Sequence, residues 1–378
     1  RSVTKFAVEI SNPRAAASVV RKAVATALSG RQGPVFLSLP LDIANDRVRP
    51  MRSACQVSTQ FALDEETISQ AAAALQASER ALILVGSGAR LPEAARLAGT
   101  LAATLGIPVC TTPRAKGLFP ESDPLSLGVF GFGGHPSASE YLEQGIDTLL
   151  AIGCGLGETG TNSWSPVLQP SRTFIQIDID GAQIGKNYQV DYGLIGPSHL
   201  VLRSLVSKVN RRSPPGLPTP GIRYVHEKDT ADDSVPLKPA RVIRGLQQLF
   251  PRDTIFTSDI GEHTIFTLHY LQVDQPDGFL VSTGMGSMGS GIGAAIGAKV
   301  VRPGRPVVAI CGDYGFQLSG MELATCVQSG IGVVFAIFND ARMRMVESGL
   351  SRIYGRTGVM HGPRNDFAAL AKAVGARG

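Results

Sequence analysis

Short runs of consecutive apolar residues alternate with segments of helical periodicity along this 378-residue chain. Two of the runs, at 306–311 (PVVAIC) and 333–338 (VVFAIF), are rich in β-branched residues and predict buried strands. Between them, apolar residues recur at near-helical spacing over 319–329, so we expect a helix that starts with Ser319 as its cap and stops at Gly330. A strand, a helix and a strand within this length predict a right-handed crossover between two parallel strands.

The same pattern extends over most of the chain and predicts an α/β fold of Rossmann-like, parallel-sheet domains with helices on both faces. Further strands are expected at 81–85, 148–152, 174–179 and 279–281, and further helices at 92–105, 291–300 and 367–374. Four prolines in the stretch 211–221, followed by charged residues, predict a linker over 211–238. This linker would separate a middle α/β domain at 59–210 from a third domain at 239–378.

The two ends of the chain contain too few predicted elements for complete domains. Residues 1–48 hold one predicted helix, with Pro13 at its start and Gly30 past its end, and one predicted strand at 35–39. One helix and one strand cannot bury a core of their own. We therefore expect 1–48 to be the C-terminal remnant of a further domain and 239–378 to lack its last strand. On this view the chain is a fragment or a partial structure, and half of a split enzyme is the less favoured interpretation.

Acidic residues follow two of the predicted parallel strands. Asp313 comes just after the strand at 306–311, and Asp340 comes just after the strand at 333–338. Because ligands bind at the carboxyl ends of the strands in open α/β sheets, we expect both side chains to lie at a ligand site. Mg²⁺ takes about six oxygen ligands, typically one or two carboxylates with phosphate oxygens and water. The pair therefore predicts a site for a metal ion and a diphosphate, the alternative being that both aspartates only cap strands and helices.

The segment from Gly312 to Asp340 resembles the thiamine diphosphate (ThDP) motif, in which Gly-Asp-Gly is followed some two dozen residues later by Asn-Asn. Between Tyr314 and Asn339 lie residues 315–338, which are twenty-four in number. The spacing and the strand–helix–strand pattern between the two halves both match the motif.

This resemblance implies that Asp313, Asp340 and the backbone carbonyl of Arg342 hold the metal ion. Two positions depart from the motif, because Tyr314 replaces a glycine and Asp340 replaces an asparagine. The second carboxylate adds a negative charge beside an anionic diphosphate, so we expect a nearby cation to compensate for it. The candidates for this cation are Arg342, Arg344 and His263.

A glycine-rich stretch, Gly284–Gly289 (GMGSMG), precedes the expected helix at 291–300. It matches G-x-G-x-x-G, the dinucleotide-binding fingerprint, so a nucleotide-binding oxidoreductase is an alternative function. That fingerprint also requires an acidic residue about twenty positions further on, whereas none occurs before Asp313. The stretch instead resembles the pattern of acetolactate synthase-like ThDP enzymes. In that family the Gly286 and Met288 positions contact the aminopyrimidine, and the Met288 side chain holds the bent cofactor.

Two further segments carry the resemblance. Residues 259–263 (DIGEH) resemble the family's D-x-G-x-H turn, which contacts the diphosphate; the alternative for His263 is a surface histidine. Met345 and Val346 match an active-site pair of acetolactate synthases, whereas Gly349 stands where that family has an acceptor-recognising tryptophan. The cofactor-binding residues implied by the resemblance are Gly261, Glu262, His263, Gly284, Gly286, Ser287, Met288, Gly312, Asp313, Tyr314, Gly315, Asp340, Arg342 and Met345.

Taken together, these motifs identify the chain as a member of the ThDP-dependent, acetolactate synthase-like enzymes, which are transferases and lyases. Membership implies decarboxylation and carboligation of a small-molecule 2-keto acid with ThDP and Mg²⁺, in a homodimer or tetramer. The family's cofactor-activating glutamate would lie upstream of Arg1, so no catalytic residue is named and the chain alone is expected to be inactive. A non-catalytic ThDP-fold protein is the third interpretation. FAD, which the middle domain binds in some relatives, is not favoured, because 86–88 and 153–155 are expected to be tight turns.

Composition excludes several other classes. The net charge of +5 and the pI of about 9.0 suit a polyanionic cofactor. The basic residues do not cluster with aromatic ones, which disfavours a nucleic-acid partner. Five scattered cysteines without a C-x-x-C motif argue for a reducing, cytoplasmic environment and against a disulfide scaffold or a zinc site. No apolar run reaches the length of a membrane span, and the N-terminus lacks the layout of a signal peptide.

Overall fold

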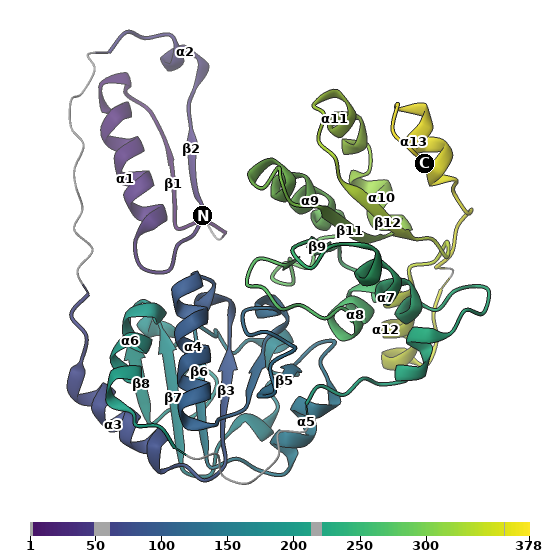
Figure 1. The fold of residues 1–378 in the computed structure, drawn as a ribbon. Coiled ribbons are helices and arrows are strands. Elements are labelled where there is room, and N and C mark those ends of the chain that lie inside the picture. The colour runs from purple at the N-terminus through teal and green to yellow at the C-terminus, as the bar shows by residue number, and fades with distance from the viewer. Residues whose placement is uncertain (1–2, 49–60, 213–220, 359) are drawn as a thin grey trace.

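The computed structural model describes residues 3–48, 61–212, 221–358 and 360–378. Within them, the strands form parallel sheets of two, six and four strands, flanked by helices, which confirms the predicted α/β class (Figure 1). The strands are β1 (Phe6–Glu9), β2 (Val35–Ser38), β3 (Ala81–Val85), β4 (Val109–Thr111), β5 (Ser126–Val129), β6 (Thr148–Ile152), β7 (Thr173–Asp178), β8 (Tyr192–Ile195), β9 (Ile255–Ser258), β10 (Phe279–Val281), β11 (Val307–Gly312) and β12 (Val334–Phe338). The α-helices are α1 (Ala16–Leu28), α2 (Leu41–Ala44), α3 (Glu65–Ala77), α4 (Pro92–Leu105), α5 (Pro136–Glu143), α6 (Ser198–Lys208), α7 (Pro239–Leu249), α8 (Glu262–Tyr270), α9 (Ser290–Val301), α10 (Asp313–Ser319), α11 (Glu322–Gln328), α12 (Arg344–Tyr354) and α13 (Phe367–Ala373).

The N-terminal segment contains one more strand than the sequence pattern predicts. Strand β1 pairs in parallel with β2, and α1 connects the two. The helix is preceded by a short 3₁₀ turn at Pro13–Ala15, in which the side chain of Asn12 accepts the Arg14 amide. The prediction of a single strand here was wrong because β1 (FAVE) ends in a glutamate and shows neither a continuous apolar run nor a clear alternation.

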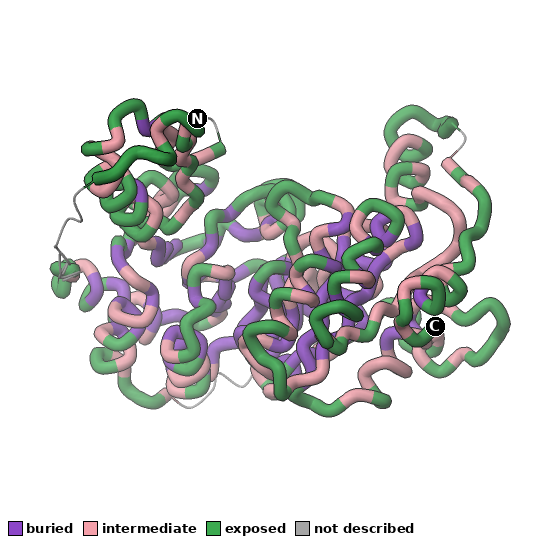
Figure 2. Tube along the Cα trace, turned by 90° about the horizontal axis from the view of Figure 1, so that it is seen from above, coloured by how far each residue is buried: buried purple, intermediate pink, exposed green. Residues whose placement is uncertain are grey.

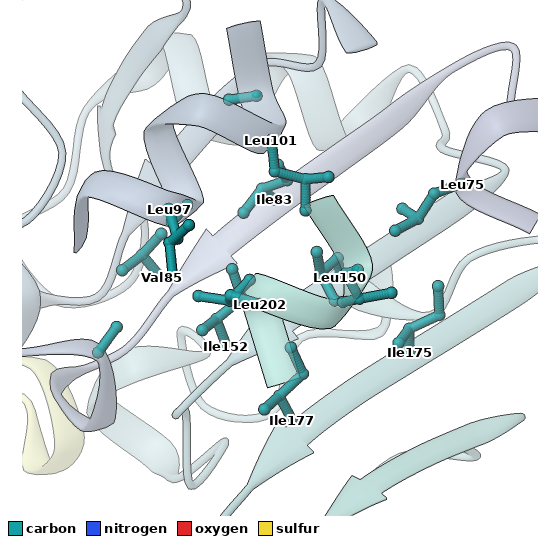
Figure 3. Close-up of a cluster of buried hydrophobic side chains, with 14 of the residues drawn as sticks. Leu75, Ile83, Val85, Leu97, Leu101, Leu150, Ile152, Ile175, Ile177 and Leu202 are labelled. Carbon is teal, nitrogen blue, oxygen red and sulfur yellow. The ribbon is translucent and has the colours of Figure 1, made fainter. Parts of the chain in front are cut away.

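The six-stranded sheet has the order β5-β4-β3-β6-β7-β8, which is the doubly wound order of a dinucleotide-binding fold. Helices α3, α4 and α6 cover one face of this sheet and α5 covers the other. Figure 3 shows the first face, where strand side chains such as Ile83, Leu150 and Ile175 meet Leu101 and Leu202 of the covering helices. Many of the buried apolar residues lie on the strands. Figure 2 shows buried segments mostly in the interior, with exposed segments around them, and burial of this apolar surface supplies the main driving force for folding.

The turns after β3 and β6 lie at the point where the strand order of this sheet reverses, and their backbones touch. The Gly88 amide donates a hydrogen bond to the Gly153 carbonyl at 2.9 Å. A Cβ atom on Gly86 would lie 2.3 Å from the Gly153 oxygen, and Gly153 itself has a left-handed φ of 57°. Both segments are therefore turns, as expected, and their glycines are required by the contact between them.

The four-stranded sheet has the order β10-β9-β11-β12. Helices α7 and α8 pack on one face, and α9, α10, α11 and α13 supply the cover on the other. The helix expected over 319–329 is present as α11, which starts three residues later than predicted, at Glu322, and ends at Gln328. The sequence analysis did not predict the preceding helix α10, which begins at Asp313 and ends at Ser319. Gly320 separates the two helices, and its backbone packs directly on the Phe316 ring, where a Cβ atom would lie 2.5 Å from ring carbons.

Buried histidines join the middle domain to the third domain. His135 accepts the Val129 amide at Nδ1 and donates from Nε2 to the carbonyl of His269 on α8. His269 accepts the Val225 amide at Nε2 and donates from Nδ1 to the Gly134 carbonyl. Each ring thus has one acceptor and one donor nitrogen, so both imidazoles are neutral. The described part of the expected linker is part of this junction, since it includes Val225.

None of the helices in the described ranges combines the length and the apolar character that crossing a bilayer requires. The four cysteines found there (Cys110, Cys154, Cys311 and Cys326) are free and buried. Cys55 lies outside the described residues.

Acidification should weaken the junction. Burial lowers the pKa of both His135 and His269, so below the ordinary imidazole pKa of about 6.5 the unfolded chain binds protons that the folded chain does not. The free energy of unfolding should be fully retained above about pH 6.5 and fall below it, by up to about 1.4 kcal/mol per pH unit for each ring. Urea unfolding between pH 8 and pH 5 measures this slope.

His135→Gln should flatten the pH dependence, whereas His226→Asn, at an exposed histidine, should leave it unchanged. Parallel curves for the wild type and His135→Gln would contradict the assignment of the slope to this pair.

Candidate functional site

The carboxyl ends of all four strands of the third domain lie at one edge of the sheet, because the strands are parallel. The turn at 259–263 follows β9, the glycine-rich loop at 282–289 follows β10, Asp313 follows β11, and the loop at 339–343 follows β12. Segments far apart in sequence are thus brought to the same edge, which is where ligands bind in open α/β sheets. We call this set of segments the carboxyl edge.

Asp313 connects the ends of β11 and β12. Its side chain is buried, and its Oδ1 accepts the Tyr314 amide at 2.8 Å while its Oδ2 accepts the Ala341 amide at 2.6 Å. Burial raises the pKa of this carboxyl group, and the two amide hydrogen bonds act in the opposite direction. Ala341 has a left-handed φ of 58°, which is uncommon for a residue with a Cβ atom. The carboxylate of Asp313 therefore holds the loop that carries Asp340.

Asp340 lies in that loop and is paired with a cation, as the sequence predicts. Its Oδ1 accepts the Arg342 amide at 3.2 Å, and its Oδ2 accepts a hydrogen bond from Nε of Arg344 at the start of α12. The Arg344 Nε is also 3.9 Å from a Glu262 carboxylate oxygen. The guanidinium of Arg342, in contrast, is paired with Glu347. Of the three candidate cations, Arg344 is the one bound to Asp340.

The main chain at Arg342 faces Asp340 rather than the neighbouring strand-like segment. Arg342 forms an antiparallel bridge with His361 in which the hydrogen bonds run between the flanking residues, from Met343 N to Met360 O and from Gly362 N to Ala341 O. In such a pair the amide and the carbonyl of the central residue point away from the partner. The Arg342 amide donates to Asp340, so its carbonyl also faces that side.

Tyr314, which departs from the glycine of the motif, packs against the same segment. A Cβ atom on Gly362 would lie 2.7 Å from the Tyr314 hydroxyl oxygen. The phenol ring therefore reaches from the Asp313 turn to the segment that pairs with Arg342. The tyrosine is accommodated because a glycine lies opposite it.

Asp259 has a role that the sequence analysis did not assign. It is fully buried, and it accepts the amide of Gly289 at 2.8 Å and the amide of Gly291 at 3.0 Å. It thereby fixes the start of α9 and the end of the glycine-rich loop. A Cβ atom on Gly315 would lie 2.1 Å from Asp259 Oδ2, so the carboxylate requires a glycine there as well. The aspartate of D-x-G-x-H was the available signal, but its partners become evident only in the fold.

Several buried polar atoms at the carboxyl edge have no hydrogen-bond partner among the described residues. They are His263 Nε2, Thr283 Oγ1, Asn339 Oδ1 and Arg342 Nε. Buried polar atoms are almost always paired in folded proteins, so these four atoms are available to a polar ligand at this edge. Burial lowers the pKa of His263, and the neutral ring can still donate to an anionic oxygen. His263 is 7% exposed, so it is not the surface histidine of the alternative interpretation.

The other predicted site residues lie at the same edge. Gly261 caps α8, Glu262 begins that helix, and Met345 lies in the first turn of α12. The glycine-rich loop is exposed from Gly284 to Ser287, whereas Met288 is half-buried. The described residues contain no group of three or more His, Cys, Asp or Glu side chains that could hold a metal ion. A metal ion here would complete its coordination with a main-chain oxygen, phosphate oxygens or water beside the two carboxylates.

Comparison with known proteins gives two family matches. Residues 68–205 match "Thiamine pyrophosphate enzyme, central domain" and residues 259–378 match "Thiamine pyrophosphate enzyme, C-terminal TPP binding domain". The chain is 33% identical to a probable acetolactate synthase large subunit of Methanocaldococcus jannaschii, over 99% of this chain and 66% of that protein. It is 31% identical to the corresponding protein of Methanococcus aeolicus (94% and 64%) and to an acetolactate synthase of Mycobacterium bovis (95% and 61%). The chain thus spans less than two thirds of the length of these relatives.

Two glycines of α9 should respond oppositely to substitution by alanine. Gly291→Ala should destabilise the fold, because the new Cβ atom would lie 2.4 Å from the Asp259 amide nitrogen. Gly293→Ala should stabilise it by up to about 1 kcal/mol, since the site is exposed and helical and no atom lies within 4 Å of the new Cβ atom. Thermal or urea unfolding measures both, and equal effects would show that Asp259 does not restrict this helix.

Proposed function

Because this chain belongs to the thiamine pyrophosphate enzymes and is similar to acetolactate synthase large subunits, we propose that its carboxyl edge binds ThDP through Mg²⁺. The metal ligands in this proposal are the carboxylates of Asp313 and Asp340 and the main-chain carbonyl of Arg342. The observation that carries the proposal is the hydrogen bond from the Ala341 amide to Asp313, which brings the two aspartates to neighbouring positions. Each of these four carboxylate oxygens accepts a hydrogen bond from the protein and has a further lone pair for a metal ion.

The diphosphate would be bound by groups that otherwise have no partner. His263 Nε2 is buried beside the ends of β9 and β11, and its ring lies within 3.2 Å of the Cβ position of Gly312. The Gly261 turn and the first residues of α10, from Asp313 to Gly315, lie next to it along the carboxyl edge. Backbone amides at the start of a helix are suited to anionic oxygens. These contacts would orient the cofactor and hold it in place.

The remaining predicted residues would contact the organic part of the cofactor and its substrate. Gly284, Gly286, Ser287 and Met288 belong to the loop after β10, and Met345 lies in the first turn of α12, which follows β12 at the opposite end of the strand order. ThDP, when bound, supplies the electron sink for decarboxylation of a 2-keto acid and transfer of the remaining fragment. The protein would position the cofactor and exclude water from it. Gly349 lacks the side chain of the family's tryptophan, and no atom lies within 4 Å of an added Cβ atom, so the space of that side chain would be open to a larger acceptor.

We further propose the division of the chain that the sequence suggests, with 1–48 belonging to a pyrimidine-binding domain, 59–210 forming the middle domain and 239–378 the diphosphate-binding domain. Assembly as a homodimer or tetramer belongs to the same proposal. The exposed glycine-rich loop, with Met285 86% exposed, supports a site completed by a second subunit.

Removal of the buried carboxylate of Asp313, a proposed metal ligand, should abolish cofactor binding. Asp313→Ala should eliminate Mg²⁺-dependent ThDP binding, measured by titration calorimetry on the folded chain. Asp340→Asn should retain it, because the amide oxygen can still bind the metal ion and the substitution restores the residue of the motif.

Asp253→Ala provides the matched control, because Asp253 is exposed and precedes β9 at the opposite end of the sheet. Unchanged ThDP affinity in Asp313→Ala would reject the metal assignment, and loss of binding in Asp340→Asn would show that the charge of Asp340 is required.

A further inference from the structure

The carboxyl edge contains one more carboxylate than the ThDP motif has, and this carboxylate is paired with a specific arginine. Asp340 stands at a position that is asparagine in the motif, and Arg344 Nε donates to its Oδ2. Arg344 also lies 3.9 Å from Glu262, so its guanidinium is placed between two acidic groups. Burial raises the pKa of Glu262, and Arg344 is the main influence that lowers it.

Other nearby cations do not take this role. The guanidinium of Arg342 pairs with Glu347, which lies on α12 like Arg344. His263 is buried, and the same burial lowers its pKa, so it adds no positive charge at neutral pH. Arg344 is therefore the positive group that acts on Asp340.

The charge balance of a metal and diphosphate site gives this pair a function. A divalent cation beside one carboxylate and one amide keeps a positive charge that attracts the diphosphate. A second carboxylate cancels that charge, and a guanidinium beside it restores the charge. Opposite charges within a few ångströms interact appreciably even where water screens them in part.

We propose that Arg344 is a positioning residue that balances Asp340, so that the site binds diphosphate despite its second carboxylate. This inference rests on the proposed function and extends it to a residue outside the motif. It has a distinctive consequence, because Arg344 opposes the binding of a bare metal ion while it favours the binding of the metal and diphosphate together. A residue that only supported the fold would affect both in the same direction.

The test measures the two affinities separately on the full chain. Binding of Mn²⁺ alone is followed by the electron paramagnetic resonance signal of the free ion, and binding of inorganic pyrophosphate at saturating Mn²⁺ is followed by calorimetry. Arg344→Gln should raise the affinity for Mn²⁺ and lower the affinity for pyrophosphate. Each change should be at least about threefold, the size expected for a partly exposed ion pair. Arg344→Lys, which keeps the charge, should restore both affinities.

The double variant Asp340→Asn with Arg344→Gln should have an affinity for pyrophosphate within about twofold of that of the wild type. A difference of this size is smaller than the usual contribution of one ion pair. Arg352→Gln is the matched control, since Arg352 is an exposed residue of the same helix. The inference is overturned if Arg344→Gln weakens both ligands, if it behaves like Arg352→Gln, or if the wild type does not bind Mn²⁺. If the wild type binds Mn²⁺ and pyrophosphate but not ThDP, this inference stands and the proposed function fails.

Discussion

Two buried carboxylates determine how the loops of the third domain are arranged. Burying a carboxylate without hydrogen-bond partners costs the folded state several kcal/mol, so backbone amides must donate to it. Asp259 accepts the amides of Gly289 and Gly291, and Asp313 accepts those of Tyr314 and Ala341. Gly289 and Ala341 belong to loops that follow other strands, and Gly291 lies in the first turn of α9, so satisfying the two acids also places these segments. The carboxyl edge is thus shaped by internal hydrogen bonding before any ligand binds.

The sequence was most informative where burial dominates. Strands such as β3 and β6 are continuous apolar runs, as expected for parallel strands covered on both faces, and they could be located to the residue. Strand β1 and the break between α10 and α11 could not be predicted. The first depends on pairing with a distant segment, and the second depends on contact between Gly320 and the ring of Phe316. Local pattern contains neither kind of information.

The candidate site divides in the same way. Asp313 and Asp340 were identified from spacing, since the lengths of the strands and of the crossover fix where both residues fall. The sequence could not show which of the three cations pairs with Asp340. That choice depends on where α12 starts and on the ion pair that Arg342 forms with Glu347. The role of Asp259 was missed because its partners lie about thirty residues away, in a loop that follows another strand.

The left-handed backbone of Ala341 is a local strain that a buried carboxylate offsets. This conformation costs a residue with a Cβ atom roughly 1–2 kcal/mol, and glycine would adopt it freely. The hydrogen bond from the Ala341 amide to Asp313 stabilises the strained backbone. The position of Asp340 is therefore coupled, through a single backbone amide, to the ionised state of the other aspartate of the pair.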